Sequence, residues 1–353
     1  MRLPQLKIAL AGLAVSLAAT GCSAATGTPS QDSDGADGSS SGARLSIVGF
    51  SVLEAANEPV LADFDQTPEG TGSTFTTSYG SSGDQSRAVE DGLPADLVHF
   101  SLEPDVTRLV DAGLVDSAWK DTPTDGIATS SVAVLVVRKG NPEGITGWDD
   151  LVKPGVEVIT PNPASSGSAK WNILAAWGHV IQAGGTQAEA KAFVSKLLSN
   201  TIALPSSGRE ATTAFSQGNG DVLISYENEA IAARAAGEEF DYVVPDDTLL
   251  IENPAAVTSD ADPVAADLLA FLTTPAAQED YATFGFRPVI DGVDLPEVEG
   301  ANDPADPFPT PAALLTIDDD FEGWDVANTK FFDEDKGIIP TLQKQTGTLG
   351  DGS

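Results

Sequence analysis

Three turns rich in small residues stand where a strand-like segment passes into a helical one, and each could hold an anion. They are SYGSSGDQ at residues 78–85, TPNPASSGS at 160–168 and PSSGRE at 205–210. The first backbone N–H groups of a helix have no partner inside the helix, and the helix dipole makes that end positive. Each turn therefore favours a negatively charged ligand, and together they predict a site made of backbone donors and hydroxyls.

Side chains able to perform covalent chemistry are few. The chain has two histidines and one cysteine. His99 stands between Val98 and Phe100, and His179 belongs to the apolar segment WNILAAWGHVI, so both are expected to pack in the core. An extracellular α/β hydrolase is the competing class of protein, but it would need a nucleophile and a base that these residues do not supply. We therefore expect no enzyme, no bound metal and no cofactor.

Composition excludes further classes. The 353 residues carry 53 Asp and Glu against 18 Lys and Arg, a formal net charge of -35. So acidic a chain is repelled by nucleic acid, and a single cysteine forms no intrachain disulfide. The hydrophobic share of 41% is enough for a sizeable core, and the length suggests two domains or one large α/β unit. The charge favours a soluble monomer, and it means that an anion must be attracted by the site itself rather than by the whole protein.

The N-terminus reads as an export signal. Arg2 and Lys7 precede an apolar run at residues 8–19 that is too short to span a bilayer. The run leads into Cys22, and the segment resembles a bacterial lipobox, with Ala19 where that pattern usually has Leu. This predicts a signal peptide at residues 1–21 and a lipidated Cys22 on the outer face of the cytoplasmic membrane; an ordinary signal peptide with a chance cysteine is the alternative. Residues 22–43 contain no large apolar side chain after Cys22 and are expected to form a flexible tether.

After this tether, short β-rich runs alternate with helical stretches. The predicted strands are residues 45–52, 74–77, 95–101, 132–138, 156–160, 221–226 and 240–245. The predicted helices are residues 104–112, 169–183, 187–199, 211–217, 229–236, 263–272, 275–284 and a last piece at 317–342. Strands that alternate with helices indicate an α/β fold with mostly parallel sheets.

Three long stretches carry a family resemblance: SYGSSGDQS at 78–86, VRKGNPEGITGWDDLVKPGVEVITPNPASSGSAKWNILAAWG at 137–178 and GDVLISYENEA at 220–230. They are similar to the sulfate- and thiosulfate-binding proteins of ABC importers, over nearly all of the chain after the tether. The resemblance implies a two-lobed type II periplasmic-binding fold, in which each lobe is a mostly parallel sheet flanked by helices and two crossover strands join the lobes. It places lobe 1 at residues 44–138 and 247–343, lobe 2 at 139–246 and a tail at 344–353.

The resemblance also implies the positions that contact the anion. Ser82 falls in the first turn, and Ser166, Gly167 and Ser168 fall in the second. Gly208 in the third turn matches another backbone donor. Tyr226 stands where sulfate binders often have a Trp that donates to the anion, and a tyrosine hydroxyl can still donate, with a different reach. Behind these contacts the candidate supporting residues are Ser81, Asp84 and Arg209.

Charged residues near the turns bear on which anion would bind. Sulfate carries no proton at neutral pH, whereas phosphate carries one and needs an acceptor. Asp84 and Glu227 are the candidate acceptors, but helix N-terminal stabilisation is the favoured role for Asp84 and a structural role is favoured for Glu227. For Arg209 we expect a scaffold role, in which it pairs with a nearby carboxylate or with loop carbonyls, rather than contact with the anion.

The sequence therefore predicts a receptor that binds sulfate and delivers it to the permease and ATPase subunits of an importer. Thiosulfate is the first alternative ligand, with phosphate and molybdate behind it. A sensor that reports the anion to a membrane kinase would use the same binding residues.

Overall fold

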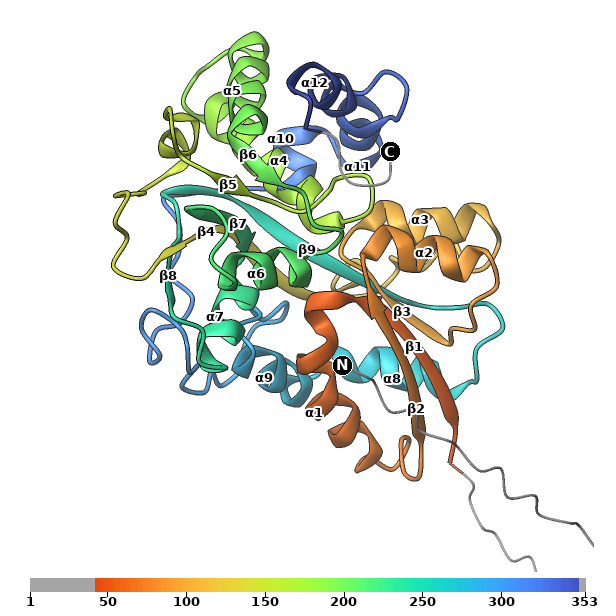
Figure 1. Cartoon of the computed structure of the whole chain (residues 1–353). Coiled ribbons are helices and arrows are strands. Elements are labelled where there is room, and N and C mark those ends of the chain that lie inside the picture. Colours follow the sequence, from red (N-terminus) through yellow and green to blue (C-terminus); the bar gives the residue numbers. More distant parts are fainter. Residues whose placement is uncertain (1–41, 349–353) are drawn as a thin grey trace, which may run out of the picture. The chain divides into compact units, whose positions relative to one another are not determined.

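Strands and helices alternate along the chain as the hydrophobic pattern predicts. The computed structural model describes residues 42–348 (Figure 1). The predicted signal peptide, Cys22 and nearly all of the tether lie outside the described residues, as do residues 349–353. No helix among residues 42–348 is long and apolar enough to cross a membrane.

A first group of strands is parallel, and helices cover both of its faces. Its elements are β1 (Arg44–Phe50), α1 (Glu54–Asp65), β2 (Thr74–Gly80), α2 (Ser82–Glu90), β3 (Leu97–His99) and α3 (Glu103–Asp111). β1 pairs in parallel with both β2 and β3. Successive side chains of a strand point to opposite faces: Val48 packs in the cluster that holds Val106 and Leu109 of α3, and Ile47 packs in the cluster that holds Phe64 of α1.

A second group repeats this pattern. Its elements are β5 (Val158–Ile159), α4 (Gly167–Gln182), α5 (Gln187–Asn200), β6 (Thr201–Ala203), α6 (Gly208–Ser216), β7 (Val222–Tyr226) and α7 (Glu227–Ala235). β5 pairs in parallel with β6 and with β7. The predicted parallel pairing is therefore present in both groups, with helices between consecutive strands.

Two long strands connect the groups. β4 (Ile127–Arg138) and β9 (Asp247–Val257) are antiparallel partners; β9 also pairs with β3, and β4 pairs with β7 and with β8 (Phe240–Val243). Within residues 42–348 every antiparallel pair of strands includes β4 or β9, and β10 (Ala313–Leu315) lies parallel to β9. All but the end residues of β4 are buried. The α/β fold class is confirmed, with the antiparallel pairs confined to these two strands.

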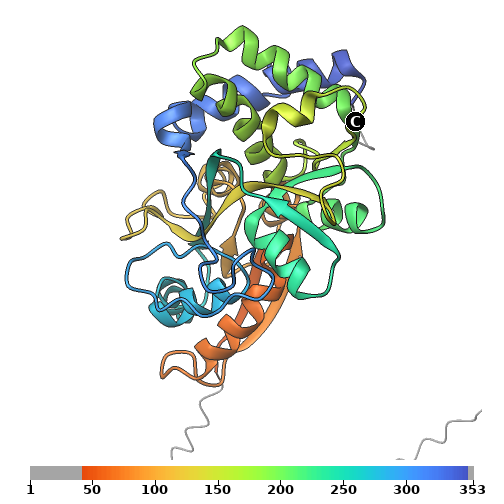
Figure 2. The same cartoon turned by 90° about the vertical axis from the view of Figure 1, so that its left-hand side faces the viewer.

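The remaining elements are short. They are η1 (Ser51–Leu53), η2 (Trp148–Val152), α8 (Val264–Leu272), α9 (Pro275–Thr283), α10 (Ile317–Phe321), α11 (Trp324–Ala327), η3 (Asn328–Phe332) and α12 (Ile338–Thr346). Both views place the C-terminal helices near α5, which contacts α12 (Figure 1 and Figure 2). The single helical piece expected at 317–342 is wrong: Glu322 and Gly323 adopt positive φ angles of 63° and 84° and end α10.

Two further elements were not predicted from the hydrophobic pattern, because each contains a proline. α1 includes Pro59 in its interior, and β9 includes Pro254. Proline lacks the N–H that helices and strand ladders use, so its presence argues against both assignments. In β9 the Pro254 carbonyl still accepts from Phe100 N–H at 2.9 Å, and the pairing with β4 shifts register beside its partner Ile127. The first strand also ends at Phe50 rather than at residue 52, because η1 begins at Ser51.

Candidate functional site

Four strand-to-helix connections meet at one small cavity. It lies where β1 passes into η1, where β2 passes into α2, and at the starts of α4 and α6. Its volume of about 10 Å³ is far below the range of about 300–1,000 Å³ that is usual for drug-sized ligands. The residues that line it are Phe50, Ser51, Val52, Gly80, Ser81, Ser82, Ser101, Ser166, Gly167, Ser168 and Gly208. The size suits a small ion, and none of these described lining residues is ionisable.

Helix N-termini supply the donors of the cavity. Ser81 and Ser166 are the N-cap residues of α2 and α4, and neither side chain caps its own helix. The N-cap of α6 is Ser207, whose hydroxyl accepts from Glu210 N–H. The first N–H groups of α2 and α4 remain to be satisfied by a partner outside the helix. The positive ends of three helix dipoles therefore converge where the sequence predicts anion binding.

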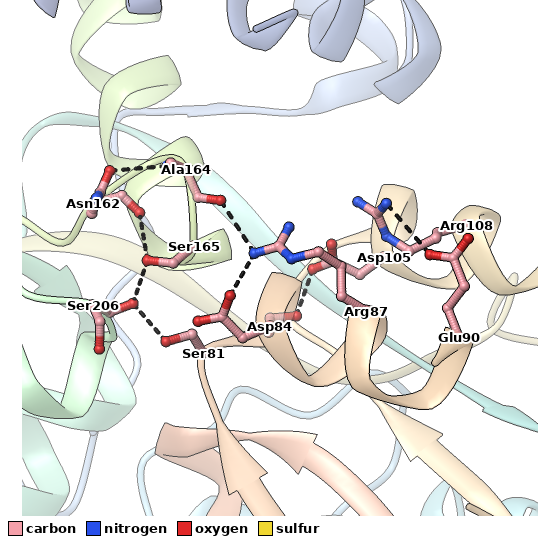
Figure 3. A network of polar contacts seen from close by, with 11 residues as sticks. Ser81, Asp84, Arg87, Glu90, Asp105, Arg108, Asn162, Ala164, Ser165 and Ser206 are labelled. Atoms are coloured by element: carbon pink, nitrogen blue, oxygen red, sulfur yellow. Dashed lines mark hydrogen bonds and ion pairs between the residues drawn. The ribbon is translucent and has the colours of Figure 1, made fainter. Parts of the chain in front are cut away.

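Hydrogen bonds hold the three predicted turns together (Figure 3). Ser206 C=O accepts from Ser81 Oγ at 2.6 Å and from Ser165 Oγ at 2.8 Å. Ser165 C=O in turn accepts from Gly83 N–H at 3.1 Å. Because these bonds join residues from α2, from the turn before α4 and from the turn before α6, the structure brings together three segments that lie far apart in the sequence.

The hydroxyl of Ser82 is already occupied. It donates to Asp105 Oδ2 at 2.6 Å and accepts from Ser101 N–H at 2.9 Å. Asp105 is buried, and burial raises the pKa of its carboxyl, while the positive charge of Lys170 and the bond from Ser82 oppose that shift. Ser82 can thus offer its backbone N–H to an anion, whereas its side chain fixes the start of α2 against α3.

Six of the predicted residues line the cavity: Ser81, Ser82, Ser166, Gly167, Ser168 and Gly208. Tyr226 is not among the lining residues. Its ring is buried at the end of β7, and its hydroxyl lies 2.6 Å from Oγ of Ser101, which does line the cavity. Burial raises the pKa of Tyr226, so the hydroxyl keeps its proton and can donate.

The charged candidates lie outside the cavity wall. Asp84 is exposed and pairs with Arg87 at 2.5 Å. Glu227 is fully buried and forms a two-point ion pair with Arg287, with N–O distances of 2.6 and 3.1 Å. Neither carboxylate is therefore positioned to accept a hydrogen bond from a ligand in the cavity.

Arg209 stands beside a buried carboxylate. Its Nε lies 3.3 Å from Oε1 of Glu229, a side chain with 1% exposure. Burial raises the pKa of Glu229, and the charge of Arg209 opposes that shift. Of the two kinds of partner expected for Arg209, the structure shows the carboxylate, which belongs to α7.

The chain matches a known family over most of the described region. The model of the bacterial extracellular solute-binding protein family matches residues 45–287. This chain belongs to that family. A sulfate-binding protein of Synechococcus elongatus is 41% identical over 320 residues, which cover 88% of this chain and 89% of the relative. A thiosulfate-binding protein of Escherichia coli is 33% identical over 293 residues, 79% of this chain and 84% of the relative.

A solved member of the sulfate-binding group shares the fold. The sulfate-binding protein SubI of Mycobacterium tuberculosis superposes with a TM-score of 0.77 and 46% sequence identity, covering 82% of this chain and all of that one. The resemblance drawn from the three quoted stretches is therefore confirmed at the level of the family.

One part of this solute-binding protein's cavity was missed from the sequence. Ser51 and Val52 contribute a fourth wall at the start of η1. A strand that leads through a serine into a helix is the same sequence signal as in the other turns. The helix that follows Ser51 was not predicted, however, because it contains Pro59. Ser101 was also missed, because it lies in the short connection between β3 and α3, which has no small-residue turn. Its presence depends on β3 lying next to β1.

Proposed function

We propose that this chain is an extracytoplasmic receptor that binds sulfate in the cavity and delivers it to an ABC importer. The observation that carries the proposal is a small cavity where helix N-termini converge and where none of the described lining residues is ionisable. Backbone N–H groups and hydroxyls can bond all the oxygens of a dianion. The names of the sulfate-binding relatives point to the same ligand.

Sulfate is favoured over phosphate by the lack of a carboxylate in the described wall. Phosphate near neutral pH carries at least one O–H, and burying that donor without an acceptor costs about 1–3 kcal/mol. Asp84 and Glu227 are both paired with arginines instead. Thiosulfate remains the second candidate, because the E. coli thiosulfate-binding protein covers most of this chain as well.

We further propose two lobes that close over the anion. Lobe 1 would comprise residues 44–138 and 247–343, and lobe 2 residues 139–246, joined by β4 and β9. On this division the bonds from Ser81 Oγ to Ser206 C=O and from Gly83 N–H to Ser165 C=O pass from one lobe to the other. Bound sulfate would stabilise this closed arrangement, which would then dock on the permease and ATPase subunits.

Calorimetric titration of the full chain with sulfate, thiosulfate, phosphate and molybdate at pH 6, 7 and 8 tests the ligand. We expect sulfate affinity to change little with pH, since sulfate is unprotonated throughout and none of the lining residues described in the structure is ionisable. Phosphate should bind about 5- to 150-fold more weakly than sulfate, because that factor corresponds to the free-energy cost of one buried, unpaired donor. Phosphate binding as tight as that of sulfate would refute the donor-only site.

A charge placed in the cavity gives a sharper test. Ser168→Asp should abolish sulfate binding, because a carboxylate would face the dianion. Ser199→Asp is the matched control: Ser199 is exposed on α5 and its hydroxyl bonds only Ser195 C=O of its own helix. Equal sulfate affinity in the two variants would place the anion elsewhere.

Lipidation at Cys22 is proposed as the membrane anchor. Cells that express the chain should retain it in the membrane fraction, and Cys22→Ser should release it into the soluble fraction. Recovery of the unaltered chain in the soluble fraction, without added lipid mass, would contradict the anchor but leave the sulfate proposal intact.

A further inference from the structure

A second cavity shares no described lining residue with the sulfate cavity. Its volume is about 390 Å³, within the range of sites for small organic molecules. It lies among α2, α3 and the turn before α4 on one side, and η3 and α12 on the other. We call it the basic cavity, after its four cations Arg87, Arg108, Lys170 and Lys344.

The charge of the basic cavity contrasts with that of the whole protein. The chain has only 18 Lys and Arg and a net charge of -35, yet four of the 18 line this one cavity. Asp333 and Glu334 are its only described acidic lining residues, so the wall carries an excess of two positive charges. A cavity with low-dielectric walls and one predominant charge concentrates ligands of the opposite charge.

Lys170 and Arg108 both keep donors that no described residue accepts. Lys170 is partly buried, and its Nζ donates to Asn328 Oδ1 at 2.9 Å, a neutral partner that uses one of its three protons. Arg108 Nε is buried without a hydrogen-bond partner among the described residues, and Nη1 of the same side chain is 3.8 Å from Glu90. The Nη groups of Arg108, a side chain with 36% exposure, and the remaining protons of Lys170 can donate to a ligand in the cavity.

The neighbouring Arg87 is held in place by other groups. Figure 3 shows its guanidinium between Asp84 and Ala164 C=O, at 2.5 and 3.5 Å. Nη2 of Arg87 is therefore committed to these two acceptors, whereas Arg108 and Lys170 keep donors that no described residue accepts.

Part of the opposite wall is apolar. Phe332, Ile339 and Pro340 line it beside Asp333, Glu334 and Lys344, and Lys170 Nζ lies 5.1 Å from the centre of the Phe332 ring. An inorganic ion would leave this wall uncovered, because it has no apolar part to bury. A ligand that satisfies both walls combines an acidic group with a hydrocarbon body.

We propose that the basic cavity binds a small organic dianion, such as a phosphate monoester, with its acidic group on Arg108 and Lys170 and its body against Phe332. This site is separate from the sulfate cavity and does not depend on the proposed sulfate function. It lies on the second turns of α2 and α4, the two helices whose first turns line the sulfate cavity.

Phenyl phosphate is the probe, titrated calorimetrically into the full chain at pH 7.5, with phenol as the uncharged control. We expect phenyl phosphate to bind and phenol to bind at least tenfold more weakly. Arg108→Gln should weaken phenyl phosphate at least about tenfold, since it removes charge-assisted hydrogen bonds. Lys344→Gln should also weaken phenyl phosphate binding. Because Lys344 is exposed, this variant can replace Arg108→Gln if that variant folds poorly.

Lys336→Gln is the matched control, because Lys336 is exposed in the same C-terminal segment and does not line the cavity. It should leave phenyl phosphate affinity within twofold. Addition of saturating sulfate should leave a phenyl phosphate binding site available. Absence of binding, competition with sulfate, or equal affinity in the Lys344 and Lys336 variants would each overturn the proposal. Sulfate titrations of the same variants report separately on the sulfate cavity.

Discussion

Gly167 offers a direct test of closure over the sulfate cavity, since an added methyl group there has no room. A Cβ at this position would lie 2.5 Å from Ser101 Oγ, 2.7 Å from Ser101 Cβ and 2.8 Å from Leu102 Cγ. Overpacking of this kind costs about 1–3 kcal/mol. Ser101 and Leu102 belong to proposed lobe 1 and Gly167 to proposed lobe 2, so the cost should fall on closure. Gly167→Ala is expected to weaken sulfate binding about 5- to 150-fold.

Other effects of this substitution are small or favourable. Alanine keeps the backbone N–H, and because the φ angle of Gly167 is not positive, the substitution favours folding by about 0.4–1 kcal/mol through the entropy of the unfolded chain. Thermal unfolding without sulfate should therefore change little. Gly208→Ala is the matched control: it also adds one methyl at a helix start that lines the cavity, but its nearest contacts are 3.2 Å from Val52 Cγ2 and 3.5 Å from Ser168.

Calorimetry with sulfate, beside thermal unfolding of each variant without ligand, separates binding from stability. Gly208→Ala should bind sulfate within about threefold of the unaltered chain, because a 3.2 Å contact needs only a small shift. Equal affinities for the Gly167 and Gly208 variants would refute the closure argument. A large fall in the unfolding temperature of Gly167→Ala without sulfate would show that the contact with Ser101 belongs to the fold and not to closure.

Three further predictions concern buried or partly buried polar groups. Tyr226→Phe should weaken sulfate binding by about 1 kcal/mol or more if its hydroxyl reaches the anion, and unchanged affinity in calorimetry would remove it from the site. Glu227→Gln should lower the free energy of unfolding by about 3–5 kcal/mol, because it leaves the charge of Arg287 unpaired, and urea unfolding measures this. Bonding to Asp247 raises the pKa of His179, so its contribution to stability is complete below about pH 6.5 and is lost as pH rises through the raised pKa. His179→Gln should thus lower the melting temperature more at pH 6 than at pH 9; an equal loss at both values would contradict this.

The histidines show where reasoning from local pattern succeeds and fails. Both were expected to pack in the core because their neighbours are apolar. His99 is fully buried, and burial lowers its pKa to about 3, so it stays neutral. His179 is only partly buried and lies 2.8 Å from Asp247 at the start of β9. The difference arises from a residue 68 positions away, which no local pattern reports.

The sequence by itself determined the family, the alternation of strands and helices, and three of the four turns that line the cavity. These features are local: a small residue ahead of a helix start leaves backbone donors free whatever surrounds it. Prolines limited this local reading, since Pro59 and Pro254 lie in elements that the surrounding structure holds in place. For this reason the fourth turn, at Ser51, was not predicted.

Only the tertiary structure decided which groups are available to an anion. The Ser82 hydroxyl is directed to Asp105, and Tyr226 is placed behind Ser101, by contacts between segments distant in sequence. The same holds for charge, because Arg108 and Lys344 are 236 positions apart yet line one cavity. Hydrogen bonds and charges act over a few ångströms in space, so their partners are set by how the strands pair and the helices pack.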